Sequence, residues 1–145
     1  MEGDANAIRS INAIVRSLGG RPVPIRKQEK PAYHMFATMI CPLLVSLLAA
    51  SENAAQLARI SRSEAHRRML PIIRQTISNY EKVGAAAAFT GPFVRGDVET
   101  VRLHLKSLSN NPAVRNVYVA LAASALKHLP HRDANRIRSA LREGT

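Results

Sequence analysis

The segment with the most evident chemistry is TGPFVRGD, residues 90–97, in which Arg95 and Asp97 flank a glycine in largely apolar surroundings. An arginine presents a fixed fork of N–H donors that can grip a carboxylate or a phosphate. Thr90 and the backbone around Gly91 would supply further donors, since glycine lets the backbone approach a ligand closely. The alternative is a loop that folds on itself, with Asp97 capping the next helix and Arg95 paired to it or to a helix C-terminus.

A second cluster, Lys30-Pro31-Ala32-Tyr33-His34, lies at the start of an apolar helix. Histidine suits proton transfer because its unperturbed pKa is about 6.5, and Lys30 can polarise a carbonyl oxygen. The alternative is structural: Tyr33 and His34 form a satisfied polar pair that ties their helix to a neighbouring carbonyl. The sequence leaves both interpretations open.

The elements that must position these residues are mostly helices. Asp4 caps a first helix that ends at Gly19-Gly20, and residues 21–25 follow as a short edge strand containing two prolines. The remaining helices are predicted from cap and proline signals: 31–58 with a kink near Pro42, 63–82 capped by Ser63 and ended by Gly84, one beginning after Asp97, one beginning at Pro112, and a last basic one after His131.

The stretch Pro31–Ser51 contains no Lys, Arg, Asp or Glu and is long enough for a membrane span. We interpret it instead as a buried central helix, because it carries polar residues and an internal proline, and the other helices can cover it. Met35 and Met39 are accordingly expected in the core, and Cys41 is expected to be a buried, inert thiol.

Composition and charge restrict the classes of ligand that the chain is expected to bind. The chain has 145 residues and a formal net charge of +11, so anions are the natural ligands. Nucleic acid is not the expected partner, because the basic residues are dispersed and few aromatics are present to stack bases. No metal-ligand spacing, GxGxxG or GxxxxGK[ST] pattern occurs, so neither a metal nor a nucleotide site is expected in this chain. The single cysteine and the acidic first residues, Glu2 and Asp4, favour a cytoplasmic protein.

Several segments together resemble a known family: the opening EGD, the SLGGRPVPI turn, Lys30–His34, Asn79-Tyr80, the motif GPxxRGDxxTxxxHL and VYVALA at 117–122. The chain resembles the uncharacterised helical domain that follows a Rossmann-like NAD(P)-binding domain in a family of oxidoreductases. That family is distantly similar to ketopantoate reductase, prephenate dehydrogenase and pyrroline-carboxylate reductase. One departure is Cys41-Pro42, where many members carry an asparagine.

The resemblance implies an all-α bundle with a long kinked central helix, residues 28–145, preceded by a helix–strand remnant of the Rossmann-like domain, residues 1–27. It implies a dimer-forming, substrate-covering domain of an NAD(P)-dependent oxidoreductase, inactive alone, with no dinucleotide site of its own and an anionic small-molecule substrate. The implied catalytic residues are Lys30, Tyr33 and His34, with His34 beside the hydride-receiving carbon. The implied substrate-binding residues are Thr90, Gly91, Arg95, Asp97 and His104. The competing hypothesis is a stand-alone helical interaction module that binds an acidic partner or nucleic acid.

Overall fold

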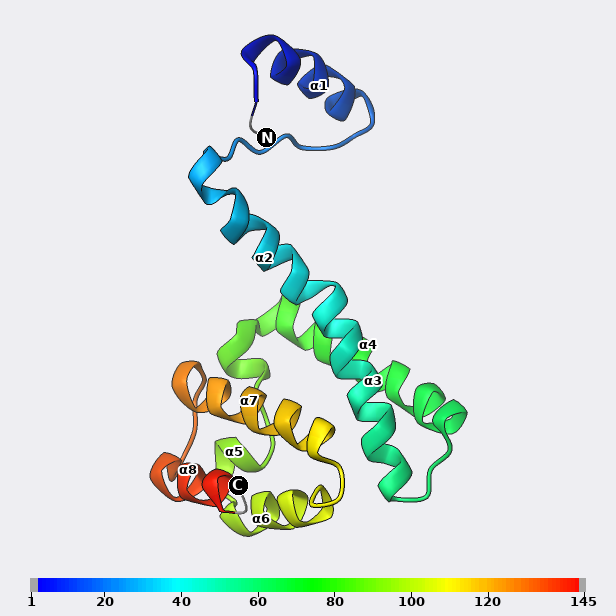
Figure 1. Ribbon diagram of the computed structural model, residues 1–145, viewed down its shortest axis with the longest axis vertical. Coiled ribbons are helices and arrows are strands. Elements are labelled where there is room, and N and C mark those ends of the chain that lie inside the picture. The colour runs from blue at the N-terminus through cyan, green and yellow to red at the C-terminus, as the bar shows by residue number, and fades with distance from the viewer. Residues whose placement is uncertain (1–2, 144–145) are drawn as a thin grey trace. The chain divides into compact units, whose positions relative to one another are not determined.

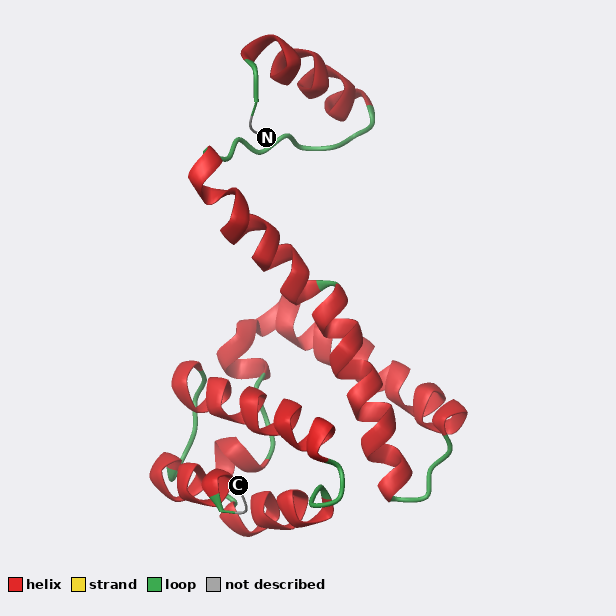
Figure 2. Ribbon diagram, in the orientation of Figure 1, coloured by secondary structure: helices red, strands yellow, loops and turns green. Residues whose placement is uncertain are grey.

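The computed structural model describes residues 3–143, and every regular element in that range is helical, so the predicted all-α class is confirmed (Figure 2). The elements are labelled in Figure 1: α1 (Ala5–Ser17), the 3-10 helix η1 (Lys27–Glu29), α2 (Lys30–Ile40), α3 (Pro42–Leu57), α4 (Arg62–Ala88), α5 (Pro92–Arg95), α6 (Val98–Ser107), α7 (Pro112–His128) and α8 (Ala134–Arg142).

The chain divides into two compact units, Met1–Val45 and Ser46–Thr145, and α3 begins in the first and continues in the second. The domain boundary after residue 27, which the resemblance to a nucleotide-binding domain implies, stays a prediction.

The first unit confirms the predicted start and end of its opening helix. Asp4 Oδ1 accepts hydrogen bonds from the backbone N–H groups of Asn6 (2.9 Å) and Ala7 (3.2 Å), and α1 ends two residues before Gly19, whose φ is 76°. The edge strand predicted at residues 21–25 is wrong, because this segment is irregular. A strand needs a second strand to accept and donate its ladder hydrogen bonds, and the described residues contain none.

The long apolar helix is present with its predicted kink. Cys41 separates α2 from α3 with φ −116° and ψ −84°, outside the helical region that a following proline disfavours, although not in the extended conformation that usually precedes a proline. Helical geometry resumes at Pro42 and continues to Leu57. The proline therefore breaks the hydrogen-bond ladder without ending the run of helix.

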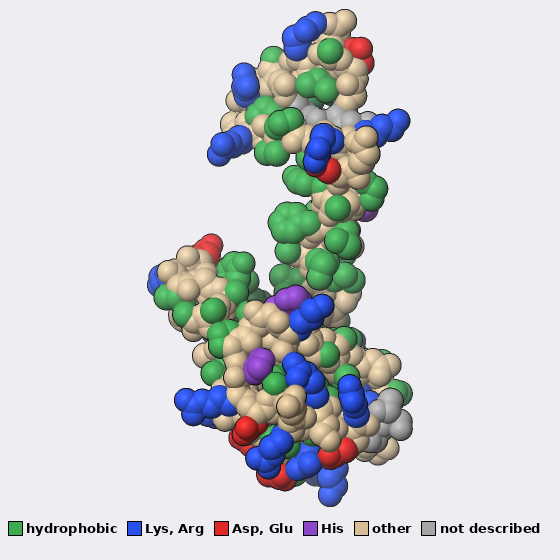
Figure 3. Space-filling view, turned by 90° about the vertical axis from the view of Figure 1, so that its left-hand side faces the viewer, with side chains coloured by type: hydrophobic (Ala, Val, Ile, Leu, Met, Phe, Trp, Pro, Cys, Tyr) green, Lys and Arg blue, Asp and Glu red, His purple; other side chains and the backbone are tan. Residues whose placement is uncertain are grey.

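The predicted burial of this helix is wrong. Met35 and Met39 are each 59% exposed, Cys41 is exposed, and neither α2 nor α3 buries a residue below the surface. Figure 3 shows apolar side chains gathered along α2. Among the described residues, the helical stretch Lys27–Leu57 is the one long and apolar enough to cross a membrane. The reason for the error is that the other described elements of the first unit, α1 and η1, leave the side chains of α2 exposed.

The core lies in the second unit, where α8 packs on α6 and contacts α7, and side chains of all three helices form one buried cluster. Val101 and Ile137 are fully buried and Leu126 is 2% exposed. The rest of the buried cluster comprises Val98, Leu105, Ala122, Ala140 and Leu141. This core fixes α6 and α7 relative to each other and so positions the side chains on their surfaces.

Of the helix boundaries predicted in the second unit, the start of α7 is confirmed, and the start and end of α4 differ from the prediction. Ser61, two residues before the predicted Ser63, caps α4 by accepting the N–H of Glu64 at 3.3 Å. Helical geometry breaks at Gly84 (φ 73°, ψ 174°) and then resumes to Ala88. Pro112 begins α7 as predicted, with Asn111 accepting the N–H of Val114 at 3.2 Å.

Candidate functional site

The TGPFVRGD segment forms a tight turn around the four-residue helix α5. Gly91 has φ 99° and Gly96 has φ 72°, a region of backbone conformation that favours glycine. A Cβ on Gly96 would also lie 3.1 Å from Arg132 Cβ, and the Arg132 N–H donates to the Phe93 carbonyl at 3.4 Å. The turn is therefore closely packed against the segment before α8.

Within this turn Asp97 has the structural role that the sequence offered as an alternative. Its Oδ1 accepts the N–H of Thr100 at 3.0 Å and its Oδ2 accepts the Thr100 hydroxyl at 2.7 Å, so it caps α6. These hydrogen bonds, and then the nearby charges of Arg95 and His104, hold the pKa of the Asp97 carboxyl below its usual range.

Arg95 lies at the edge of the same turn. One guanidinium nitrogen is 4.0 Å from Asp97 Oδ2, and the side chain is 65% exposed. An exposed pair at this distance contributes little to stability. The guanidinium of Arg95 therefore keeps N–H donors accessible to an anion in solution.

His104 is held by a residue that the sequence analysis did not single out. Its Nδ1 lies 3.0 Å from the hydroxyl of Tyr118 on α7, and the rings meet edge to face with centroids 5.8 Å apart. Tyr118 is half-buried and also contacts the ring of Phe93 at 6.0 Å. Burial raises the pKa of Tyr118 to about 12, so its hydroxyl stays protonated at neutral pH.

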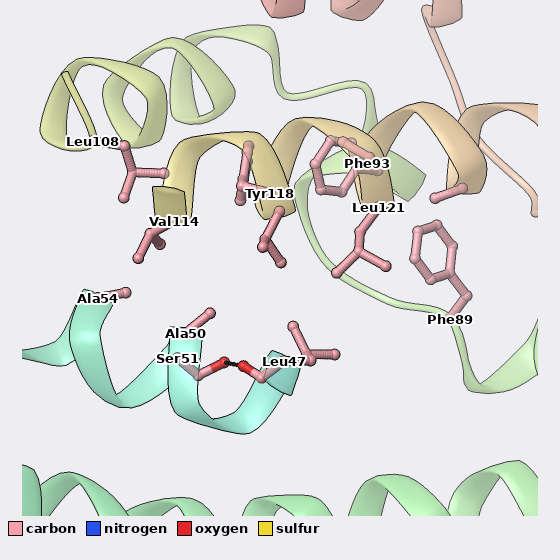
Figure 4. A pocket seen from close by; sticks show the side chains of 13 residues that line it. Leu47, Ala50, Ser51, Ala54, Phe89, Phe93, Leu108, Val114, Tyr118 and Leu121 are labelled. Atoms are coloured by element: carbon pink, nitrogen blue, oxygen red, sulfur yellow. Dashed lines mark hydrogen bonds between the residues drawn. The ribbon is translucent and has the colours of Figure 1, made fainter. Parts of the chain in front are cut away.

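An apolar groove lies in the second unit between α3 and α7, and we call it the α3–α7 groove. Its first part has a volume of about 250 Å³, and Figure 4 shows Leu47, Ala50 and Ala54 of α3 facing Val114, Tyr118 and Leu121 of α7. Phe89 and Phe93, which flank Thr90-Gly91, close one end. A neighbouring cavity of about 340 Å³ shares Ala54, Leu108 and Tyr118 with it and adds His104 and Ser107.

The catalytic candidates of the first unit lie on the first turns of α2. Lys30 is its first residue, Tyr33 is 51% exposed with its ring 6.4 Å from that of Phe36, and His34 is exposed. The His34 carbonyl accepts the Thr38 hydroxyl at 2.9 Å. Tyr33 and His34 are thus solvent-facing neighbours on one helix.

Comparison with known families identifies the domain. Residues 1–125 match the model of a family described as a domain of unknown function, DUF2520. The chain belongs to the DUF2520 family. No curated protein and no solved structure matches it.

The match to DUF2520 covers every candidate site residue and ends inside α7. In this DUF2520 chain α8 lies beyond the matched residues, yet Ile137, Ala140 and Leu141 of α8 complete the core against α6 and α7. The helix outside the match is therefore part of the structure that holds His104 and Tyr118 in place.

Sequence reasoning missed Tyr118 and the α3–α7 groove of this DUF2520 domain. The available signal was that His104, in the last turn of one helix, and Tyr118, in the second turn of the next, lie on either side of a short connection. Two helices joined in this way run antiparallel, so side chains close to the turn can meet. The sequence contains no signal for the groove, because its width depends on the distance between α3 and α7.

Proposed function

We propose that this DUF2520 chain is the dimer-forming and substrate-covering domain of an NAD(P)-dependent oxidoreductase whose dinucleotide site lies in a separate Rossmann-like domain. The oxidoreductase part rests on the resemblance of the GPxxRGDxxTxxxHL motif and of Lys30–His34. The dimer part rests on one observation, the exposed apolar surface of α2.

That surface, which we call the α2 face, is formed by side chains that recur at helical spacing. Its members are Tyr33, Met35, Phe36, Met39 and Ile40 of α2 together with Leu43 at the start of α3, each more than half exposed. Contiguous apolar surface of this kind marks an interaction site. A two-fold contact between two copies covers the same face on both chains at once, which makes a homodimer the simplest way to bury it.

Each unit by itself has its own proposed roles. In the second unit Arg95 grips an anionic group of the substrate, and His104 with Tyr118 supplies hydrogen bonds from neighbouring helices. In the first unit His34 would take or give a proton and Lys30 would polarise a carbonyl oxygen. The nicotinamide cofactor, held elsewhere, supplies the hydride.

The dimer is tested by sedimentation of the chain in low salt and in molar salt. We expect a dimer in both, because an apolar contact survives the screening of charges. A monomer in both conditions contradicts the proposal. A dimer lost only at high salt favours the electrostatic interaction module, and flotation of the chain with neutral vesicles favours a membrane surface as the partner of the α2 face.

The cofactor assignment is tested in two ways. Titration calorimetry of this chain with NADH or NADPH should give an affinity weaker than about 1 mM, because no Gly-rich turn before a helix is present to hold a pyrophosphate. The genomic reading frame upstream of Met1 should encode a strand followed by GxGxxG. Micromolar binding, or a stop codon and ribosome-binding site directly before Met1, contradicts the proposal.

A further inference from the structure

The two ends of the α3–α7 groove differ in chemistry. One end is lined almost wholly by apolar side chains, with Phe89, Phe93 and Leu121 on one wall and the short side chains of Ala50 and Ala54 on the other. The other end is also largely apolar, with Leu57, Ala58 and Leu108 in its lining, but it carries the polar groups of His104, Ser107 and Tyr118. We call it the polar end, because a groove that is apolar along its length and has polar groups at one end suits a ligand with the same two parts.

The apolar end of the groove has room for a further apolar group. Apolar atoms that line an open groove gain contacts when an apolar group packs against them. Ala50 and Ala54 leave this space because their side chains are short, while the opposite wall carries aromatic rings. A ring or a branched aliphatic group would make those contacts.

In each protonation state of His104, the polar end has an N–H or O–H donor that is not used within the His104–Tyr118 pair. When His104 is neutral with its proton on Nε2, the Tyr118 hydroxyl donates to Nδ1 and the Nε2–H is left over; with the proton on Nδ1, that N–H donates to Tyr118 and the tyrosine hydroxyl proton is left over. When His104 is protonated, its Nδ1–H donates to Tyr118, and both the Nε2–H and the tyrosine hydroxyl proton are left over. In either state the pair offers a hydrogen bond to an acceptor.

The acceptor is best an anion. Among the described residues that line the two cavities none is acidic, and Asp97, whose charge reaches His104, already accepts two hydrogen bonds from Thr100. Ser107 donates its own hydroxyl to the Leu103 carbonyl at 2.9 Å, so its proton is not available to a ligand. The net charge of +11 further favours an anionic ligand.

We infer that the α3–α7 groove binds a small carboxylate with an aromatic or branched apolar body, whose carboxylate accepts hydrogen bonds from the His104–Tyr118 pair, while any further anionic group of the substrate is left to Arg95. This inference rests on the proposed function in that it names the class of substrate that the domain covers. The body occupies the space beside Ala50 and Ala54, and the carboxylate lies at the end where Tyr118 and His104 meet.

The experiment uses three probes and the full chain. 3-Phenylpropanoate has both parts, 3-phenylpropan-1-ol lacks the carboxylate, and propanoate lacks the ring. We expect saturable binding of the first by calorimetry and at least about tenfold weaker binding of the alcohol, because a hydrogen bond to a charged group is lost. Propanoate should show no saturable binding. Equal affinity for acid and alcohol, or no saturable binding of the acid, overturns the inference.

Two variants locate the site. Ala50→Leu fills the apolar end and should abolish binding, whereas Ala49→Leu adds the same side chain to an exposed neighbour outside the groove and should leave it unchanged. Tyr118→Phe keeps the ring and removes the hydroxyl, so the preference for acid over alcohol should fall severalfold while the alcohol binds as before. This second variant decides the matter even if Ala50→Leu fails to fold. Equal effects of the two leucine variants, or unchanged preference in Tyr118→Phe, overturn the inference.

The readout separates this inference from the proposed function. Probe binding needs neither cofactor nor a second domain, so it can succeed when the upstream reading frame contradicts the oxidoreductase assignment, and it can fail when that assignment stands. If Ala50→Leu changes the sedimentation of the chain, a second copy occupies the groove and the small-ligand inference is overturned.

Discussion

Helices α2 and α8 differ in composition and burial in opposite directions. α2 (Lys30–Ile40) is mostly apolar and buries no residue, whereas α8 (Ala134–Arg142), with three arginines, buries Ile137, Ala140 and Leu141. The three buried residues of α8 have the i, i+3, i+4 spacing that makes one narrow face, and α6 covers that face. Apolar content alone therefore does not produce burial. A side chain is buried when its spacing matches a face that another element can cover.

The difference between the two helices predicts opposite responses to the same substitution. Ile137→Ala should lower the free energy of unfolding by about 2–5 kcal/mol, since it empties a fully buried site in the core. Ile40→Ala, at a position that is 58% exposed, should change it by less than about 0.5 kcal/mol. Urea unfolding followed by circular dichroism, at a protein concentration low enough to keep the chain monomeric, measures both. Comparable losses would mean that α2 is covered within one chain.

The α2 face should matter for association. Phe36→Glu places a charge in the proposed contact and should shift the chain from dimer to monomer, weakening association by about 100-fold or more, because an unpaired charge would be buried. Thr38→Glu adds the same charge about half a turn away and serves as the control. Sedimentation equilibrium of the two variants checks the prediction. Monomerisation by both variants, or by neither, would place the contact elsewhere.

The sequence predicted the local features of the fold well. The caps at Asp4 and Asp97, the start of α7 at Pro112 and the kink before Pro42 each depend on hydrogen bonds or steric contacts within a few residues. The cap of α4 was misplaced by two residues, since Ser61 and Ser63 carry the same signal and only the chain direction at the turn selects one.

The sequence could not predict features that depend on distant contacts. The burial of Met35 and Met39 was predicted from apolar content, but burial needs a covering element and the described elements of the first unit leave α2 exposed. Among the site candidates, the cap role of Asp97 was foreseen, whereas the contact of His104 with Tyr118 depends on how α6 and α7 pack. The roles of Lys30, Tyr33, His34, Thr90, Gly91 and Arg95 in binding or catalysis stay predictions.

The two aspartate caps extend the comparison between the units. Asp97→Ala should lower the melting temperature by about 2–6 °C, because it removes the cap of a core helix. Asp4→Ala removes a similar cap from α1, which buries no residue, and should leave the cooperative melting transition unchanged. Thermal melts of both variants measure the difference. A similar loss in Asp4→Ala would mean that α1 unfolds together with the core.

The pH dependence of the Asp97 effect has a defined sign. The folded-state pKa of Asp97 is lowered, so its stabilisation is present above the unfolded pKa of about 3.9 and is lost as the pH falls through the folded pKa. The gap in melting temperature between Asp97→Ala and the parent chain should therefore narrow at acidic pH. A gap that stays constant down to about pH 2 would show that the cap does not depend on the charge of the carboxylate.

Thiol labelling sharpens the comparison at the level of one residue. Cys41, predicted to be buried, is exposed at the junction of α2 and α3, so N-ethylmaleimide should modify it in the native protein at a rate only severalfold below that of the urea-unfolded chain. Cys41 is five positions beyond Phe36, which on a continuous helix is well away from the α2 face. The labelling rate of Cys41 should therefore be nearly the same in the parent chain and in Phe36→Glu.

A relocated cysteine tests the α2 face directly. In the variant that combines Met39→Cys with Cys41→Ser, the thiol lies on the face, so its labelling should be slow in the dimer. Adding Phe36→Glu should restore fast labelling. Protection of Cys41 itself in the native dimer would show that the contact wraps around α2 and would replace the one-sided two-fold interface with a helix enclosed by its partner.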